Sequence, residues 1–124
     1  MADAADSLYS LYQKGMSLLE AGDFAPATVP LSKAARLAPE KSSIREALGR
    51  AYFRSQRYAE AAREFEAVVE RYPVNDFAHF CLGRALTLTG QGDRARRHLA
   101  IAANLRPERE DYRIYRERLA ARLS

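Results

Sequence analysis

Cysteine and long apolar stretches are scarce in this sequence of 124 residues, and each scarcity excludes a class of structure. A single cysteine, Cys81, excludes an internal disulfide and fits a reducing compartment. No apolar stretch approaches the roughly 18 residues that a membrane-spanning helix needs. The first residues are acidic and lack the basic flank and apolar core of a signal peptide. We therefore expect a cytoplasmic protein that does not enter the membrane.

Lysine is also scarce, since only three of the 20 Lys and Arg residues are lysines. The arginines are unevenly placed, with ten of them against five acidic residues in positions 84–124. The simplest interpretation is a solvated helical surface with Arg–Glu pairs, and the alternatives are an acidic partner or a nucleic acid. Only Tyr112 and Tyr115 are interleaved with these arginines, so nucleic-acid binding is disfavoured.

Glycine and proline are few, yet several of them recur at one constant spacing along the chain. Small and apolar residues follow the same spacing, which makes the chain three copies of one unit. The recurring sets are Gly15, Gly49 and Gly83; Ala27, Ala61 and Ala95; Leu31, Phe65 and Leu99; and Pro39, Pro73 and Pro107. We expect two packed helices to approach closely at the glycines and alanines, because only short side chains leave room there.

Apolar residues within each copy recur three and four positions apart, which predicts amphipathic helices. Two helices fit each copy, and one more helix follows the last of the recurring prolines. The seven predicted helices are about 5–21, 24–37, 43–54, 58–72, 77–88, 93–105 and 108–123. The last one has an apolar face and a charged face, as a helix that covers the end of an array needs.

Four local details are predicted at the ends of these helices. Asp23 is expected to cap the second helix, and Ser43 with Glu46 is expected to form a capping box at the start of the third. Pro30 lies past the first turn of its helix, which predicts a kink or a late, irregular start. Gly92 stands where the other copies have an aromatic residue, which predicts a looser turn before it.

These residues resemble the tetratricopeptide repeat, which has Trp, Leu-Gly, Tyr, Ala, Phe and Pro at fixed positions in a unit of about 34 residues. The middle copy is the fullest match, with Leu48-Gly49, Tyr52, Ala61, Phe65 and Pro73. The tryptophan position holds Leu11, Arg45 and His79, so Arg45 is expected to snorkel or to face solvent.

The resemblance implies an all-α fold, a right-handed superhelical array of antiparallel helix hairpins with seven helices. It places repeats at about 8–41, 42–75 and 76–109 and a capping helix at about 108–123. All of these lie in a single domain over residues 1–124.

By resemblance to the family, the first helix of each pair lines a concave groove that binds a peptide segment of a partner protein. The residues expected in that groove are Tyr9, Tyr12, Met16, Glu46, Arg50, Phe53, Phe77, Phe80 and Arg84. They favour a peptide with apolar side chains and at least one carboxylate, because Arg50 and Arg84 can donate charge-assisted hydrogen bonds. The alternative is that these aromatic residues pack on each other or on the capping helix.

Some family members hold the acidic tail of heat-shock chaperones with a clamp of Lys, Asn and Arg side chains. The matching positions here are Tyr12, Met16, Ala47, Phe77 and Cys81, so that clamp is absent.

Catalytic, cofactor and metal sites are not expected. No Ser-His-Asp order, glycine-rich phosphate loop or paired acidic site stands out. His79 and His98 lie too far apart in the pattern, and lack Cys or Asp companions, for a metal site. Cys81 is expected to be a small buried apolar residue.

The sequence thus predicts a non-enzymatic protein-interaction module, an adaptor or a co-chaperone-like protein. A homo-oligomeric scaffold is the first alternative, through the first hairpin or through the face with Tyr112, Tyr115, Leu119 and Leu123. A bacterial secretion chaperone that buries an apolar segment in its groove is the second. The identity of the partner stays open, because the fold shows only where a peptide could lie.

Overall fold

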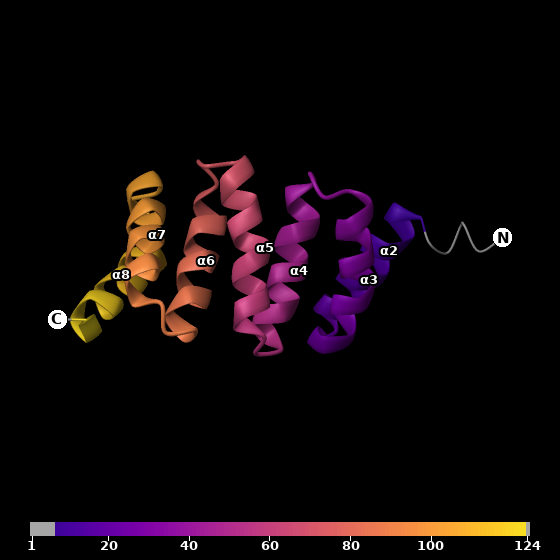
Figure 1. The fold of residues 1–124 in the computed structure, drawn as a ribbon, viewed down its shortest axis with the longest axis horizontal. Helices are drawn as coiled ribbons and strands as arrows, with labels where there is room; N and C mark the ends of the chain where they lie inside the picture. The colour runs from indigo at the N-terminus through magenta and orange to yellow at the C-terminus, as the bar shows by residue number, and fades with distance from the viewer. Residues whose placement is uncertain (1–6, 124) are drawn as a thin grey trace. The chain divides into compact units, whose positions relative to one another are not determined.

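The computed structural model describes residues 7–123, which form seven helices and contain no strand. The helices are α2 (Leu8–Glu20), α3 (Phe24–Leu37), α4 (Ser42–Arg54), α5 (Tyr58–Arg71), α6 (Asp76–Leu88), α7 (Gly92–Leu105) and α8 (Glu110–Leu123) (Figure 1). This confirms the predicted all-α class and the seven helices. Residues 5 and 6 of the first predicted helix lie outside the described part, and α2 begins at Leu8 with Ser7 as its N-cap.

The chain divides into two compact units, one ending at Glu64 and the other beginning at Phe65, with the boundary inside α5. In the first unit, α3 packs against both α2 and α4, and α2 also contacts α4. In the second unit, α7 packs against α6 and α8, and α8 also contacts α6.

Three turns share one hydrogen-bond pattern, in which an N–H donates to the carbonyl five residues back. The pairs are Asp23 to Leu18 at 2.8 Å, Arg57 to Tyr52 at 2.8 Å and Gln91 to Leu86 at 2.9 Å. The residue before each donor has a positive φ, 84° at Gly22, 67° at Gln56 and 79° at Gly90. The turn before Gly92 thus keeps the backbone hydrogen-bond pattern of the other two turns. Its second bond, from the Gly90 N–H to the Thr87 carbonyl, is 3.3 Å, against 3.0 Å for the equivalent bonds of Gly22 and Gln56.

The proline-containing helix α3 begins at Phe24 and continues through Pro30, so the late start predicted for it is wrong. Pro26 lies in the first turn, where its missing N–H has no intrahelical acceptor. Ala27 and Leu31 on the inner face are fully buried. Their burial outweighs the roughly 3 kcal/mol that a proline costs inside a helix.

The predicted capping box at Ser43 and Glu46 is also wrong. α4 begins one residue earlier, with Lys41 at the N-cap and no side-chain cap hydrogen bond. The Lys41 N–H donates to the Ala38 carbonyl at 3.1 Å, and this turn places Ser43 inside the helix rather than at its cap. Asp23 does occupy the N-cap of α3, as predicted, although its side chain makes no cap hydrogen bond.

Two recurring glycines lie where one helix of a hairpin meets the other, as predicted. A Cβ added to Gly83 would lie 2.7 Å from both Cγ and Cδ2 of Leu99, and one added to Gly15 would overlap the Leu31 side chain. Leu31 and Leu99 are themselves buried. The close approach of the helices therefore requires glycine, because the space of a methyl group is already filled by leucine.

Helix α8 covers the second unit, as predicted for a capping helix. Tyr112 is fully buried and donates its hydroxyl proton to Asp76 Oδ2 at 2.6 Å. Leu119 is buried as well, and Leu123 lies over Gly92, at 3.0 Å from where a Cβ would be. Leu123 thus occupies room that an aromatic side chain at Gly92 would need.

Candidate peptide-binding surfaces

The first unit has a small hollow between α2 and the start of α4, which we call the N-terminal hollow. It encloses about 220 Å³ and is lined by Leu8, Tyr9, Tyr12, Lys41, Ser43 and Ile44. Tyr9 has 71% of its surface exposed, whereas Ile44 is buried. The hollow therefore joins an exposed aromatic ring to an apolar wall, and it contains two of the predicted groove residues.

The other predicted residues of this unit differ in how much surface they present. Tyr12 and Met16 are half-buried and pack against the apolar core of the unit. Arg50 is exposed, and Glu46 is half-buried. Phe53 lies edge-on to Tyr58, with ring centroids 5.1 Å apart. Phe53 is thus partly used in packing between aromatic residues.

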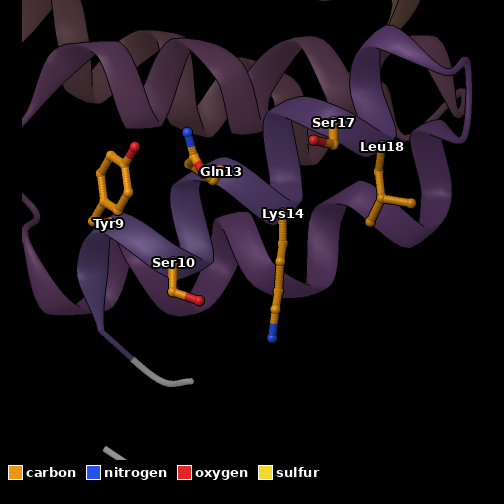
Figure 2. Close-up of a pocket in the computed structure, with 6 residues that line it drawn as sticks. All are labelled: Tyr9, Ser10, Gln13, Lys14, Ser17 and Leu18. Atoms are coloured by element: carbon orange, nitrogen blue, oxygen red, sulfur yellow. The ribbon is translucent and has the colours of Figure 1, made fainter. Parts of the chain in front are cut away.

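A second, more open hollow is lined by residues of α2 alone (Figure 2). It is lined by Tyr9, Ser10, Gln13, Lys14, Ser17 and Leu18. Gln13 and Lys14 point to opposite sides of the helix in Figure 2. Because every lining residue comes from one helix, this hollow has no second wall to hold a peptide, and it is an exposed helix face rather than a pocket.

In the second unit, α8 covers one of the predicted groove residues. Phe80 is only 6% exposed, and its ring lies 4.6 Å from that of Tyr112 and 5.3 Å from that of Tyr115. The Arg84 guanidinium lies 4.6 Å from the centre of the Tyr115 ring. Phe77 remains partly exposed. Helix α8 therefore covers Phe80, whereas Phe77 and Arg84 are less buried.

Between α6, α7 and α8 lies a pocket of about 250 Å³, which we call the arginine pocket. It is lined by Arg84, Thr87, Leu88, Leu99, Tyr115, Arg118, Leu119 and Arg122. The sequence predicted Arg84 as a groove residue, whereas Arg118 and Arg122 were expected only in a basic surface at the C-terminal end of the array. Arg118 and Arg122 are four residues apart in the sequence, which could have indicated that they share a helix face.

The position of the family's tryptophan carries a polar link between two helices in the middle repeat. Arg45 forms an ion pair with Glu64 at 3.0 Å and donates a hydrogen bond to the Pro39 carbonyl at 2.8 Å. The Arg45 and Glu64 side chains are 24% and 18% exposed, so Arg45 is largely covered and its guanidinium is paired rather than directed freely into solvent. Burial raises the pKa of Glu64, and the charge of Arg45 offsets part of that rise.

The corresponding positions of the third repeat hold His79 and His98, which are in contact. Their Nδ1 atoms are 3.0 Å apart, and His79 Nε2 lies 2.8 Å from the Pro73 carbonyl oxygen. The prediction that these histidines lie too far apart is wrong, because the antiparallel hairpin brings them face to face. Among the residues that the structure describes, no group of three or more His, Cys, Asp or Glu could hold a metal ion.

The pKa of His98 falls from 6.5 to about 4, first because the ring is buried. The neighbouring His79, Arg94 and Arg97 lower the His98 pKa further, and Glu66 opposes them. One nitrogen of the pair must donate and the other accept, so the observed contact requires that the two facing Nδ1 atoms are not both protonated.

None of the described helices is long and apolar enough to cross a membrane. The chain repeats its turns and its helix pairs at one constant spacing. The interhelical contacts Arg45–Glu64 and His79–His98 follow the same spacing. The sequence profile of the tetratricopeptide repeat matches residues 12–76 and 46–111. The chain belongs to the tetratricopeptide repeat family.

Solved structures of this family share the fold. MamA from residue 41 to its end, from Desulfovibrio magneticus RS-1, superposes with a TM-score of 0.89 at 26% identity, and the match covers 94% of this chain. The chain spans 66% of that MamA structure. MamA MSR-1 superposes with a TM-score of 0.85 at 26% identity over 94% of this chain and 67% of its own.

The first tetratricopeptide domain of Spaghetti (RPAP3), bound to the HSP90 peptide SRMEEVD, has a TM-score of 0.87 at 18% identity. The match covers 94% of this chain and 92% of that domain, and it shows the fold alone. Among proteins with curated functions, none matches this chain.

Proposed function

We propose that this protein is a non-enzymatic interaction module that binds a peptide segment of a partner protein. The observation that carries the proposal is the N-terminal hollow, where the exposed Tyr9 and the half-buried Tyr12 face the buried Ile44. An apolar peptide side chain placed there would gain contact area with little rearrangement. Membership of a family of binding proteins supports the same function.

The proposed binding residues form one set in each unit. The first set is Tyr9, Tyr12, Met16, Glu46, Arg50 and Phe53, and the second is Phe77, Phe80 and Arg84. The exposed guanidinium of Arg50 is suited to a carboxylate of the peptide. Phe80 contributes through its support of Arg84 and Tyr115 rather than by direct contact, because α8 covers it.

The RPAP3 domain was solved with an HSP90 peptide, but this chain has Tyr12, Met16, Ala47, Phe77 and Cys81 at the clamp positions. We therefore propose a cytoplasmic adaptor for another acidic and apolar segment rather than for that chaperone tail.

The proposal is tested with 12-residue peptides selected from a random library and measured by fluorescence anisotropy. Arg50→Glu should raise the Kd of selected peptides at least about tenfold, which corresponds to about 1.4 kcal/mol. Arg63→Glu is the matched control, because Arg63 is also exposed and the change in net charge is the same. Equal affinities of the two variants would contradict a role for Arg50, and unchanged binding by Tyr9→Ser would contradict a role for the hollow.

A homo-oligomeric scaffold remains the alternative function. The face of α8 that was predicted for self-association is unavailable, because Tyr112 and Leu119 are buried within the second unit. The exposed side of α2 that carries Tyr9 is the better candidate, since Tyr9 and Gln13 are both exposed there (Figure 2). Light scattering across concentration decides between a monomer and an assembly, and Tyr9→Ser should weaken any assembly through this face.

A further inference from the structure

The lining of the arginine pocket is rich in positive charge. Three of its eight lining residues are arginines, and none of these eight, all within the described part of the chain, is acidic. Other arginines, just before and at the start of α8, form ion pairs with acidic residues close to them in the sequence. Their ion pairs are Arg106–Glu108 at 3.3 Å, Arg109–Asp111 at 2.7 Å and Arg113–Glu110 at 3.5 Å. The pocket therefore concentrates positive charge.

Two of the three guanidiniums are held near one aromatic ring. Arg84 lies 4.6 Å and Arg118 5.8 Å from the centre of the Tyr115 ring, both within the range of a cation–π interaction. Arg122 follows Arg118 at a spacing of four residues on the same helix, where like charges destabilise the helix by about 0.2–0.5 kcal/mol. An anion in the pocket would relieve this repulsion and find its donors already positioned.

The floor of the pocket is apolar. Leu99 and Leu119 are buried beneath it, and Leu88 forms a wall that is half exposed. Thr87 offers no free donor, because its hydroxyl donates to the Gly83 carbonyl at 2.8 Å. The pocket thus has room for one large apolar side chain below a rim of cations.

We propose that the arginine pocket binds an acidic segment of a partner polypeptide, in which a large apolar side chain is flanked by carboxylates. The apolar side chain would lie on Leu99 and Leu119, and the carboxylates would pair with Arg118 and Arg122. This inference rests on the proposed peptide-binding function and adds a second contact, in which α8 takes part. Because the lining carries arginines and no acidic residue, its charge is complementary to that of an acidic segment.

A nucleic acid fits this pocket less well. Binding of single strands uses aromatic faces on which bases stack. Tyr115 is the aromatic residue in the lining, and its ring already interacts with the guanidiniums of Arg84 and Arg118. The apolar floor also gives no contact to phosphates.

The test uses a fluorescein-labelled peptide, Gly-Asp-Glu-Leu-Asp-Gly, blocked at its C-terminus, and measures anisotropy with the full chain. Arg118→Glu should raise the Kd of this probe at least about tenfold, which corresponds to about 1.4 kcal/mol. Arg116→Glu is the matched control, since it changes an exposed arginine on the same helix by the same charge. It should change the Kd less than about twofold, as expected for a long-range charge effect. Circular dichroism checks that both variants fold.

Two further probes resolve the chemistry. Replacing the leucine of the peptide by glycine, or its acids by their amides, should abolish binding to the pocket. Equal loss of affinity in Arg118→Glu and Arg116→Glu would overturn the proposal, because it would indicate unspecific attraction. An oligonucleotide or 3-phenylpropionate that shows the same Arg118 dependence, while the peptide does not bind, would also overturn it.

Failure of this inference can be told apart from failure of the proposed function. If library-selected peptides bind and depend on Arg50, but neither they nor the acidic probe depends on Arg118, the pocket is not a binding site and the module still is. The opposite result is that Arg118→Glu weakens binding of the acidic probe, while Arg50→Glu and Tyr9→Ser leave the Kd of the selected peptides unchanged. It would support the arginine pocket as a binding site and contradict the proposed contacts of the first unit.

Discussion

Acid should destabilise the hairpin formed by α6 and α7, because its helices are joined through a histidine pair. At the equivalent positions of the middle repeat, the link is the ion pair of Arg45 and Glu64 at 3.0 Å. His79 Nε2 must donate to the Pro73 carbonyl oxygen, so its Nδ1 accepts from His98 Nδ1, 3.0 Å away. Protonation of His98 would place a positive charge on a buried ring beside His79, Arg94 and Arg97.

The size and sign of this effect follow from the pKa of His98, which folding lowers from 6.5 to about 4. The folded state therefore binds the proton more weakly than the unfolded state does. The contribution of neutral His98 to the free energy of unfolding is fully present above pH 6.5, and it is lost as the pH falls from 6.5 towards about 4. A difference of this size corresponds to about 3 kcal/mol, and solvent screening at the partly exposed ring reduces it to about 2 kcal/mol.

The assay is urea unfolding followed by circular dichroism between about pH 7 and about pH 4.5, for the wild type and for His98→Gln. Glutamine cannot titrate but can still hydrogen-bond to His79. The carboxylates titrate similarly in both proteins and cancel in the difference. The wild type should lose about 2 kcal/mol more than the variant over this range. A second variant, His79→Arg with His98→Glu, copies the ion pair of the middle repeat and should remove the same histidine-dependent loss.

Equal pH dependence of the wild type and His98→Gln would refute the reasoning. It would mean that the buried ring accepts a proton without cost, or that the hairpin opens locally before the pair is broken. Hydrogen exchange at the amides of α6 and α7 separates these two explanations, because only local opening speeds exchange at mildly acidic pH beyond its intrinsic change.

Three further changes test the packing. Gln56→Gly should stabilise the protein by about 0.5–1 kcal/mol in urea unfolding, because Gln56 has φ 67° and only glycine adopts this conformation freely; a loss of stability would contradict this. Gly83→Ala should cost about 1–3 kcal/mol in the same assay through overlap with Leu99, and a neutral result would show that the helices can separate. Tyr112→Phe should cost about 1–2 kcal/mol by removing the hydrogen bond to Asp76, and an unchanged melting temperature would argue that water replaces the hydroxyl.

Much of the fold could be predicted from the sequence, because its determinants are local and periodic. Glycine at 22 and 90 adopts the positive φ that a helix end requires, and prolines end the repeats. The failures are equally physical. Pro30 by itself suggests a late helix start, but α3 begins at Phe24 and its inner face is buried. Ser43 by itself predicts a cap, but the preceding backbone turn starts the helix one residue earlier.

The candidate site could be predicted only in part. The pattern placed Tyr9 and Tyr12 on the correct helix, and both line a hollow. It could not show that α8 covers Phe80, since that depends on how Tyr112 and Tyr115 dock. The contribution of α8 to a second pocket was missed for the same reason.

The sequence by itself determined the repeat, its helices and its family, because a constant spacing of like residues can be read along one dimension of the chain. Only the tertiary structure decided which charged and polar groups meet. His79 and His98 are 19 residues apart in the chain, as are Arg45 and Glu64, and both pairs form only because antiparallel helices bring these positions together. The arginine pocket likewise exists only once α8 has packed on α6 and α7, with Tyr112 buried and Arg118 and Arg122 lining the pocket together with Arg84.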